Sequence, residues 1–257
     1  MYQNYIFDFY GTLVDIHTDE ERPALWKQMS QLYSVYGADY DPEQLKKAFY
    51  EQCRDAEDAL QSEMNISYAE IDLAKIFIFL LKHAPKYHQV QHTILDMNEW
   101  VYGTANTFRI LSRTKLKTYP YTIQVLKRLK RLGFHVFILS NAQRIFTMPE
   151  MEQSGILSYA DGVYISSDYR MKKPESEFLA ELLNQERLKK DESVMIGNDC
   201  QSDIASAVSN QMHSIFLDTA KHDETERNEM ISAAVHGHSA WMPDVIADGD
   251  IRKILRI

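Results

Sequence analysis

The sequence predicts an α/β protein in which a central parallel sheet is interrupted by an inserted α-helical unit. Three observations lead to this fold class. From residue 120 onward, short apolar runs alternate with amphipathic segments, which is typical of βαβ units in a parallel sheet. Residues 5–9 form a further apolar run that must join the same sheet. Between these two parts, residues 17–117 show helical periodicity and contain no strand-like run.

The first predicted strand lies at residues 5–9, where an apolar run contains one acid and is ended by Gly11. An apolar run bounded by glycine is typical of a buried strand in a parallel sheet. Asp8 then lies near the carboxyl end of that strand, where open α/β sheets bind their ligands. Burial of a carboxylate is unfavourable unless it is paired or bound to a metal. Asp8 is therefore either a functional carboxylate or a side chain that caps the following turn.

Residues 17–117 predict a helical unit with a core of its own. Asp41-Pro42 has the form of a helix start, with aspartate as the N-cap and proline in the first turn. Residues 67–70 have the form of a capping box ahead of apolar residues at helical spacing. Two further helices are expected at about residues 24–36 and 93–111. Apolar stripes of this kind are typical of a bundle core rather than of a ligand-binding surface.

The segment from residue 118 onward predicts the rest of the sheet and its flanking helices. The predicted strands are residues 134–139, 162–165, 193–196, 214–217 and, at an edge, 243–246. The predicted helices are residues 122–132, 144–154, 175–186, 202–209 and 248–255. This order predicts a Rossmann-like core of three layers. We therefore expect a core domain of residues 1–16 and 118–257 and an inserted helical domain of residues 17–117.

The composition is that of an ordinary globular protein, with 45% hydrophobic and 25% charged residues over 257 positions. A formal net charge of -9 argues against a nucleic-acid-binding surface and against an anionic-membrane patch. The two cysteines fit a reducing compartment. The longest apolar run, residues 76–81, is too short to span a bilayer, and no signal peptide is recognisable. We expect a soluble, cytoplasmic protein that acts on a small molecule.

Polar side chains are also expected at the sheet edge after the strand at residues 134–139. Ser140 and Asn141 follow that strand directly, and a hydroxyl with neighbouring backbone amides can hold an anion there. The same pair is also ordinary turn chemistry. Lys173 precedes a proline that presets the first turn of the next helix, so its amine can reach back toward developing negative charge. Its neighbour Lys172 is expected to be solvated.

Asp199 and Asp203 follow the predicted strand at residues 193–196 and are four residues apart. Two carboxylates at the end of a strand suit a hard cation that prefers oxygen ligands. Such a cation would also allow Asp8 to approach an anionic substrate without severe repulsion.

These segments, in this order, resemble the four motifs of the haloacid dehalogenase-like (HAD) hydrolase superfamily. The first is Asp-x-x-Gly-Thr-Leu-Val-Asp at residues 8–15, and the others contain Ser140, Lys173 and the acids after Gly197. The position of the helical unit, between the first two motifs, resembles the C1-type cap of subfamily I. The resemblance therefore implies a HAD-like core domain with an inserted helical cap that closes over the site.

The resemblance also implies roles for individual residues. Asp8 would be a nucleophile that forms a covalent aspartyl intermediate. The residues implied in catalysis are Asp8, Tyr10, Ser140 and Lys173, and those implied in phosphate binding are Gly11, Thr12, Ser140, Asn141 and Lys173. The implied cofactor is Mg²⁺, held by Asp8, the backbone carbonyl of Tyr10, Asp199 directly and Asp203 indirectly. Asn198 stands where the family commonly has the first acid, so this last detail differs from the usual pattern.

Tyr10 is the departure with the largest consequence. Phosphatases of this superfamily have a second aspartate there, which protonates the leaving group, and such acid–base help is worth ~10²–10⁴-fold in rate. Tyrosine, with an ordinary pKa of about 10, is poorly matched to that task. Asp-x-Tyr-Gly-Thr is instead similar to the first motif of L-2-haloacid dehalogenases, whose leaving halide needs no proton.

Three hypotheses follow for the activity. The first is a Mg²⁺-dependent phosphatase or phosphotransferase acting on a small phosphorylated metabolite with a good leaving group, such as an acyl phosphate. The second is a 2-haloacid dehalogenase; Trp26-Lys27-Gln28 resembles the substrate-side Trp-Arg stretch of that family, but Lys27 lacks the arginine fork that clamps a carboxylate. Such enzymes also need no metal and no acids after Asn198. The third is a non-catalytic, degenerate member that binds a phosphorylated metabolite or a protein partner. The retention of four motif residues together counts against it: Asp8, Ser140, Lys173 and Asp199.

Overall fold

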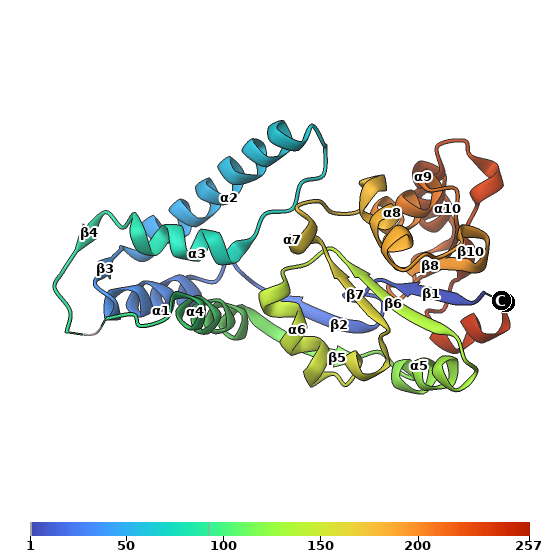
Figure 1. Ribbon diagram of the computed structural model, residues 1–257, viewed down its shortest axis with the longest axis horizontal. Helices are drawn as coiled ribbons and strands as arrows, with labels where there is room; N and C mark the ends of the chain where they lie inside the picture. The colour runs from blue at the N-terminus through green and yellow to red at the C-terminus, as the bar shows by residue number, and fades with distance from the viewer. Residues whose placement is uncertain (1, 92) are drawn as a thin grey trace.

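The computed structural model describes residues 2–91 and 93–257. Within these residues, six strands form one parallel sheet in the order β10-β9-β8-β1-β6-β7 (Figure 1). The strands are β1 (Asn4–Phe7), β6 (His135–Ser140), β7 (Gly162–Ile165), β8 (Ser193–Gly197), β9 (His213–Leu217) and β10 (Asp244–Ile246). The predicted parallel sheet, with residues 5–9 contributing a strand across the helical insertion, is confirmed.

Helices cover both faces of the sheet because the buried side chains of each strand alternate between two cores. Tyr5 and Phe7 pack with Leu126 of α5, whereas Ile6 packs with Phe178 of α8 on the opposite face. The helices of this part are α5 (Thr122–Arg131), α6 (Arg144–Gln153), α7 (Ser166–Tyr169), α8 (Ser176–Gln185), α9 (Ala205–Ser209) and α10 (Glu224–Val235). Shorter turns are η1 (Leu157–Tyr159), η2 (Lys190–Glu192), η3 (Cys200–Ile204), η4 (Ser239–Trp241) and η5 (Ile251–Arg256). The expected three-layer α/β architecture is therefore present.

A helical unit lies beside the sheet, at the left of Figure 1. It comprises α1 (Pro23–Val35), α2 (Pro42–Met64), α3 (Leu73–Lys82) and α4 (Met97–Ser112), with a short β3 (Ala38–Asp39)–β4 (Lys86–Tyr87) pair. Its core is aromatic and separate from the sheet cores, and it includes Trp26, Phe49, Phe77 and Phe108. Phe146 of α6 joins this core, so the unit packs directly on α6. That the unit is a domain with boundaries at residues 17 and 117 stays a prediction.

Two antiparallel strands carry the chain between the sheet and the helical unit. These are β2 (Val14–Thr18) and β5 (Arg113–Thr118), which pair from Val14 with Thr118 to Thr18 with Arg113. Neither strand was predicted, since the first was divided between the first motif and the helical unit and the second was assigned to the unit. The β2–β5 pair begins only a few residues after Asp8. A short stretch of chain therefore connects the predicted nucleophile to the helical unit.

The start of α2 is as predicted, whereas the starts of α3 and α4 are not. Asp41 caps α2 and forms a capping box with Gln44. The predicted box at residues 67–70 is wrong, because α3 begins at Leu73 with Asp72 as its N-cap. Residues 67–70 instead run beside the core, where Ala69 pairs with Met171. The helix expected from residue 93 begins at Met97, after the N-cap Asp96.

The carboxyl-terminal part also contains differences from the prediction. The helix expected at residues 202–209 is α9 preceded by the π-helical turn η3. The last predicted helix is a 3₁₀ turn, η5, and α10 was not predicted. The edge strand β10 lies where it was expected. None of the described helices combines the length and the apolar content that a membrane crossing requires.

Candidate active site

The candidate site lies at the carboxyl edge of the sheet, where β1, β6 and β8 end side by side. Phe7 of β1 is in register with Ile138 of β6 and Ile196 of β8. The residues that follow, Asp8 and the Gly197-Asn198 pair, are therefore neighbours, with Ser140 at the end of β6. The parallel register is thus what brings together groups from distant parts of the chain.

Lys173 extends into this edge from the loop between α7 and α8 and is 2% exposed. Its Nζ donates to Asp8 Oδ1 at 2.8 Å, to Asp203 Oδ1 at 2.7 Å and to the Leu139 carbonyl at 2.6 Å. These three acceptors use all three ammonium hydrogens. Burial alone would lower the pKa of Lys173, but the charges of Asp203 and Asp8 outweigh burial and raise it. The side chain is therefore a fixed cation beside Asp8.

Asp203 supports this cation from the far side of the site. Its Oδ1 receives Lys173, its Oδ2 accepts the backbone N–H of Asp199 at 3.0 Å, and its side chain is 1% exposed. Burial raises the pKa of Asp203 to about 7, although the Lys173 charge opposes this and the Asp8 charge adds to it. A Cβ on Gly197 would lie 2.0 Å from Asp203 Oδ2, so no larger residue fits there without displacing the carboxylate.

Thr12 lies between Asp8 and Asn198. Its Oγ1 is 3.3 Å from Asp8 Oδ2 and 3.0 Å from Asn198 Oδ1, so both oxygens lie beside one hydroxyl. Gly11 has φ +83, and a Cβ there would come within 2.6 Å of the Asn198 amide. The Gly11 carbonyl accepts the Thr219 hydroxyl at 2.7 Å, which fixes the turn after Asp8. The turn therefore requires glycine both for its backbone angle and for its close approach to Asn198.

Ser140 and Asn141 have different surroundings although they are adjacent. Ser140 is fully buried, and its Oγ has no hydrogen-bond partner among the described residues. Asn141 is used within the protein: its Nδ2 donates to the Lys173 carbonyl at 2.9 Å, and its Oδ1 accepts the Lys173 N–H at 2.8 Å. A buried hydroxyl without a partner is unfavourable by about 1–3 kcal/mol, so Ser140 Oγ is a natural donor to a ligand oxygen.

The Tyr10 hydroxyl is engaged with α6 rather than with Asp8. It donates to Glu150, which is 2% exposed, and lies 3.2 Å from Thr147 Oγ1. Glu150 also accepts from Arg109 Nε at 2.7 Å and from Arg113 Nη1 at 2.7 Å. Burial and the Glu150 charge raise the pKa of Tyr10 above its ordinary value. A phenol held in this way is not available as a general base near neutral pH.

Asp199, predicted as a direct metal ligand, is exposed. Its carboxylate accepts the Gln201 N–H at 2.8 Å and the Ser202 hydroxyl at 2.9 Å, and so caps η3. Within the described residues, no group of three or more His, Cys, Asp or Glu side chains is placed to hold a metal. The assignments of Asp199 and Asp203 to a metal therefore stay predictions.

The oxygen donors near Asp8 nevertheless fit Mg²⁺. This ion commonly takes only one or two protein carboxylates and completes its octahedron with water and substrate oxygens. Asp8 Oδ2, a carboxylate oxygen, and Asn198 Oδ1, an amide oxygen, both lie beside the Thr12 hydroxyl. A hard cation prefers oxygen ligands of these two kinds. The residues present thus suit such an ion, and the Asn198 amide oxygen is one of the oxygens beside the Thr12 hydroxyl.

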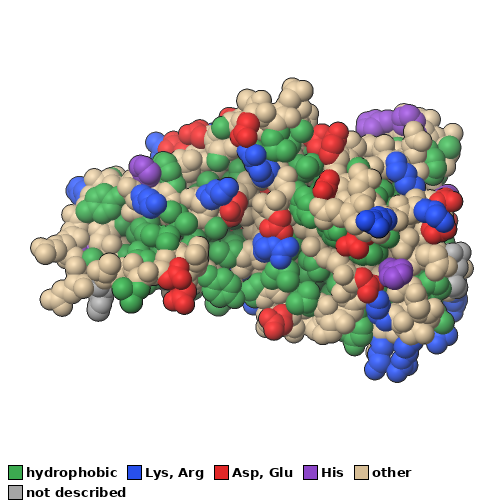
Figure 2. Space-filling view, viewed as in Figure 1, with side chains coloured by type: hydrophobic (Ala, Val, Ile, Leu, Met, Phe, Trp, Pro, Cys, Tyr) green, Lys and Arg blue, Asp and Glu red, His purple; other side chains and the backbone are tan. Residues whose placement is uncertain are grey.

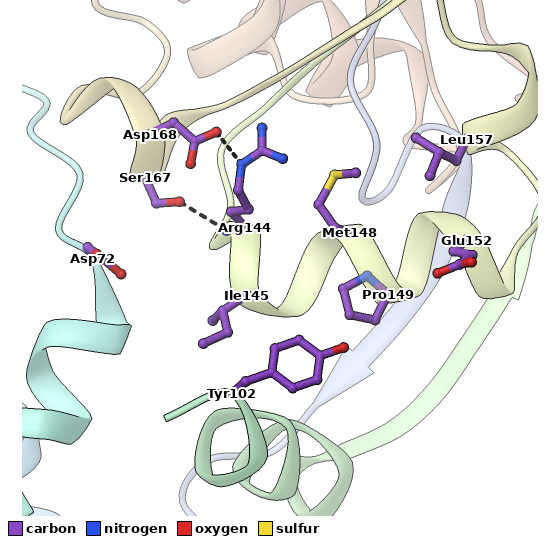
Figure 3. A pocket seen from close by; sticks show the side chains of 10 residues that line it. All are labelled: Asp72, Tyr102, Arg144, Ile145, Met148, Pro149, Glu152, Leu157, Ser167 and Asp168. Atoms are coloured by element: carbon purple, nitrogen blue, oxygen red, sulfur yellow. Dashed lines mark hydrogen bonds and ion pairs between the residues drawn. The ribbon is translucent and has the colours of Figure 1, made fainter. Parts of the chain in front are cut away.

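A pocket of about 450 Å³ lies on α6 and contains none of the predicted site residues. Figure 3 shows Arg144, Ile145, Met148 and Glu152 along this helix, with Arg144 paired to Asp168. Figure 2 shows apolar side chains gathered on this face at the boundary between the helical unit and the sheet. Because Asp8 lies elsewhere and is 7% exposed, this pocket is distinct from the candidate site.

Several residues that support the site from distant parts of the chain were not predicted from the sequence. Glu150 and Arg109 secure Tyr10, whereas Glu70 and Gln143 connect the helical unit to the loop after β6. Glu70 belongs to a local motif, the predicted capping box at residues 67–70, but that motif does not indicate its distant partners, and no local motif pairs the other three residues. A buried acid in the middle of an amphipathic helix, as at Glu150, is the one local feature that indicates a partner.

The fold and site together define an α/β protein in which a carboxylate at the end of the central strand, the candidate nucleophile, is paired to a buried lysine. Residues 5–217 match the family of haloacid dehalogenase-like hydrolases. The chain therefore belongs to this family, which confirms the resemblance that the motifs indicated.

Relatives with assigned activities match about half of the chain. A glyceraldehyde 3-phosphate phosphatase of Methanocaldococcus jannaschii is 27% identical over 123 residues, 48% of this chain and 54% of the relative. A ribulose-1,5-bisphosphate 5-phosphatase of Halopiger xanaduensis is 25% identical over 120 residues, 47% of this chain and 48% of the relative. The chain thus spans about half the length of the relatives that it matches.

Solved structures with the same fold cover the whole chain. A 2-haloacid dehalogenase from Pseudomonas syringae pv. Tomato has a TM-score of 0.60 at 15% identity, covering 100% of this chain and 99% of its own. A HAD phosphatase from Thermococcus onnurineus has a TM-score of 0.56 at 17% identity, covering 98% and 97%. Both kinds of enzyme share this fold, so the fold alone does not choose between them.

Proposed function

We propose that this hydrolase is a Mg²⁺-dependent phosphatase or phosphotransferase that acts through Asp8 on a small phosphorylated metabolite with a good leaving group. The observation that carries the proposal is the geometry around Asp8. Lys173 holds the carboxylate by one oxygen, and the buried Ser140 hydroxyl at the same sheet edge has no protein partner among the described residues. A fixed cation and an unused donor beside a carboxylate form a cradle for a transferring anion. The curated relatives, which are phosphatases, agree with this choice over the part they share.

In the proposed reaction, an Asp8 oxygen attacks phosphorus and the bond to the leaving oxygen breaks, so that oxygen departs with the electron pair. Lys173, Ser140 and backbone amides near Asn141 would hold the negative charge on the phosphoryl oxygens. Water then attacks phosphorus of the aspartyl phosphate and the bond between phosphorus and the Asp8 oxygen breaks. This step restores the Asp8 carboxylate and releases inorganic phosphate, which carries the protons of the water. Because Asp8 is only 7% exposed, water is largely excluded until the leaving group has departed.

The residues that would hold Mg²⁺ are the Asp8 carboxylate and the backbone carbonyl of Tyr10, with a third oxygen from the Asn198-Asp199 pair. When bound, the ion would reduce the repulsion between Asp8 and the phosphoryl group. Asn198 Oδ1 already lies beside the Thr12 hydroxyl that contacts Asp8, whereas Asp199 faces solvent. Both Asp203 oxygens have donors, which favours a supporting role for it.

The Asn198-Asp199 pair offers a direct test of the ion's protein ligands. We expect Asn198→Ala to weaken Mg²⁺ binding, measured by titration calorimetry, more than Asp199→Ala does. The reverse order would return the direct role to Asp199, as the sequence pattern indicated. Equal affinity in both variants and the parent chain would remove the third ligand from the proposal.

The leaving group is restricted by the state of Tyr10. Its hydroxyl is held by Glu150 and its pKa is raised, so position 10 contributes neither a general acid nor a general base. A leaving group that departs without a proton, such as the carboxylate of an acyl phosphate or a phenolate, avoids this requirement. We therefore assign acyl or aryl phosphates as the preferred substrate class.

A 2-haloacid dehalogenase is the second candidate, because a halide also leaves without a proton and dehalogenases share the fold over the whole chain. The Trp26-Lys27-Gln28 stretch does not support it. Trp26 is 2% exposed in the core of the helical unit and donates to the Glu20 carbonyl, while Lys27 is exposed. Lys27 is therefore not placed to clamp a substrate carboxylate. A non-catalytic member is less well supported, because the Lys173–Asp8 pair is complete.

The experiment measures hydrolysis of acetyl phosphate, 4-nitrophenyl phosphate and 2-chloropropionate by the purified protein, each with Mg²⁺ and with EDTA. We expect phosphate release that requires Mg²⁺, is fastest with acetyl phosphate and is absent in Asp8→Asn. Chloride release that persists in EDTA would replace the proposal with a dehalogenase. Binding of phosphate without turnover of any substrate would favour the non-catalytic hypothesis.

A further inference from the structure

The segment between α2 and α3, residues 66–72, lies against the loop that carries Lys173; we call it the strap. In Figure 1 it passes beside α7 on its way from α2 to α3. Ala69 forms an antiparallel bridge with Met171. The Lys172 N–H donates to the Tyr68 carbonyl at 2.9 Å, and the Glu70 N–H donates to the Arg170 carbonyl at 3.2 Å. The strap thus pairs with the backbone immediately before Lys173.

Side chains strengthen the contact on both sides of this pairing. Glu175, which follows Pro174, accepts the N–H groups of Ser67 at 3.1 Å and Tyr68 at 3.0 Å. Lys172, which was expected to be solvated, donates to Glu57 of α2 at 2.8 Å. The strap and α2 therefore contact the Lys173 loop from several directions.

Glu70 extends this contact to the loop that follows Ser140. Its Oε1 accepts Gln143 Nε2 at 2.9 Å, and its Oε2 accepts the Ser166 hydroxyl at 2.8 Å. Ser166 in turn accepts the Ala142 N–H at 2.8 Å. One carboxylate on the helical unit therefore orients two side chains that flank Ala142, the residue directly after the Ser140-Asn141 pair.

Gln143 is tied to the helical unit through both ends of its amide. Besides its bond to Glu70, its Nε2 donates to the Ile71 carbonyl at 2.8 Å, and its Oε1 accepts the Leu73 N–H at 2.8 Å. These contacts are made entirely with the strap and the first turn of α3. They exist only while the helical unit is docked on the loop after β6.

The Glu70 carboxylate is well suited to hold these partners because both of its oxygens accept hydrogen bonds and it is only partly exposed to water. Burial raises its pKa above the ordinary value, while the Ser166 hydrogen bond and the Lys172 charge oppose this. Hydrogen bonds to a charged acceptor are roughly twice as strong as those between neutral groups. Loss of the carboxylate would remove the group that holds the Ser166 hydroxyl and the Gln143 amide together, and would leave the Gln143 amide with only its bonds to Ile71 and Leu73 among the described residues.

We propose that Glu70 is a positioning residue that couples docking of the helical unit to assembly of the anion cradle at Ser140-Asn141. This inference rests on the proposed function only in taking that cradle as the site of the transferring group. Glu70 does not touch the reacting atoms. It fixes the loop whose Ser140 hydroxyl and backbone amides receive the anion, so the cradle is complete only in the docked state.

The test measures binding of orthovanadate, an oxyanion that resembles a transferring phosphoryl group, by titration calorimetry. The variants are Glu70→Ala, Gln143→Ala and the double variant, with Glu63→Gln as the control. Glu63 also pairs across this contact, with Arg170, but both side chains are largely exposed and neither holds Ala142. We expect Glu70→Ala to weaken binding by roughly 10- to 100-fold, as expected for loss of charge-assisted bonds, and Glu63→Gln to leave it unchanged.

The double variant separates positioning from general destabilisation. If Glu70 acts through Gln143, the combined loss is smaller than the two single losses together, because both variants remove one shared contact. Vanadate affinity equal to that of the parent in Glu70→Ala, or fully additive losses, would overturn the inference. If Glu70→Ala does not fold, Glu70→Gln, which retains one acceptor oxygen, replaces it in the single and double variants. We then expect an intermediate loss of vanadate affinity.

The same measurements distinguish this inference from the proposed function. A protein that binds vanadate in a Glu70-dependent way but hydrolyses neither acetyl phosphate nor 4-nitrophenyl phosphate would refute the phosphatase and leave the positioning role intact. A protein that hydrolyses acetyl phosphate equally well with and without Glu70, measured as kcat, would refute the positioning role alone. A parent chain that binds no vanadate at all would overturn the inference, because it would have no cradle to assemble.

Discussion

The helical unit contacts the sheet part of the molecule at two places that differ in chemistry. Near β5, Glu150 is 2% exposed and lies between Tyr10, Arg109 and Arg113, so the contact is a buried ionic cluster. At the strap, the contact consists of backbone pairing, of hydrogen bonds from the neutral Gln143 and Ser166 side chains to Glu70, and of exposed ion pairs at the rim, such as Arg170–Glu63.

The difference indicates which contact can open. Removing one partner from a buried ionic cluster leaves an uncompensated charge and is strongly unfavourable. Backbone groups and exposed charges, by contrast, can exchange their partners for water at little net loss. We therefore expect the Glu150 cluster to remain closed as a fixed anchor for Tyr10, and the strap to separate when substrate enters or product leaves.

The largest expected effect is at Lys173, whose ammonium group pairs with both Asp8 and Asp203. Lys173→Met leaves the Asp8 and Asp203 carboxylates buried without their partner, so we expect the free energy of unfolding to fall by about 3–5 kcal/mol. Phosphate release should also be lost. Denaturant unfolding measures the first effect, and Lys172→Met is the matched control because that side chain is partly exposed.

The pH dependence of the stability of Lys173→Met tests whether the loss of stability comes from the buried Asp203 carboxylate. Burial raises the folded pKa of Asp203 to about 7 even with the lysine present, so the ionised carboxylate is the unfavourable form in the variant. Protonation removes this penalty, and the stability deficit should shrink as pH falls from 8 toward 5. A deficit that grows with acidity would contradict the assignment of the buried charge.

The second effect tests the buried anchor. Glu150→Ala leaves Arg109 and Arg113 without their shared carboxylate, and we expect a loss of about 3 kcal/mol in the free energy of unfolding. Glu152→Ala, an exposed acid on the same helix, should change stability little. Equal effects of the two substitutions would mean that the cluster is not an anchor.

A smaller effect distinguishes a structural role of Tyr10, through its bond to Glu150, from a direct catalytic role. Tyr10→Phe removes one bond to Glu150, and we expect a loss of about 1–2 kcal/mol in stability with little change in acetyl phosphate turnover. A residue that protonated the leaving group would instead lower turnover by ~10²–10⁴-fold on removal. A fall of that size would return Tyr10 to a direct catalytic role.

The smallest effect is expected at the rim of the strap. Glu63→Gln removes an exposed partner of Arg170, and stability should change by no more than about 0.5 kcal/mol. A loss comparable to that of Glu150→Ala, measured in the same denaturant, would remove the distinction between a fixed anchor and a separable contact.

The residues whose position at the sheet edge could be predicted from the sequence are those at or directly after the ends of strands. Asp8, Ser140 and the Gly197-Asn198 pair meet because parallel strands in register end at one edge, which periodicity and glycine positions indicate locally. The roles of individual groups depend on distant partners and could not be predicted in the same way. Asp199 turns outward to cap η3, and Tyr10 turns to Glu150, which lies 140 positions away.

The strap is the clearest failure of local pattern. Ser67 and Glu70 have the spacing of a capping box, yet the Glu70 carboxylate binds Gln143 and Ser166 instead of a helix terminus. Glu70 pairs with residues that are distant in the sequence rather than with the nearby backbone. A single sequence does not reveal such distant partners. The unpredicted α10 has a different cause, since its buried residues, Ile231, Ala234 and Val235, occur only in its last turns and give no stripe over its length.

The central claim is that Asp8 forms a covalent bond to a phosphoryl group. The most direct measurement is mass spectrometry of the protein quenched in acid during turnover of acetyl phosphate with Mg²⁺. The account predicts one phosphoryl group on the peptide that contains Asp8, absent in Asp8→Asn and after chelation of the metal. A phosphoryl group on another residue, or an ester of Asp8 formed only with 2-chloropropionate, would contradict it.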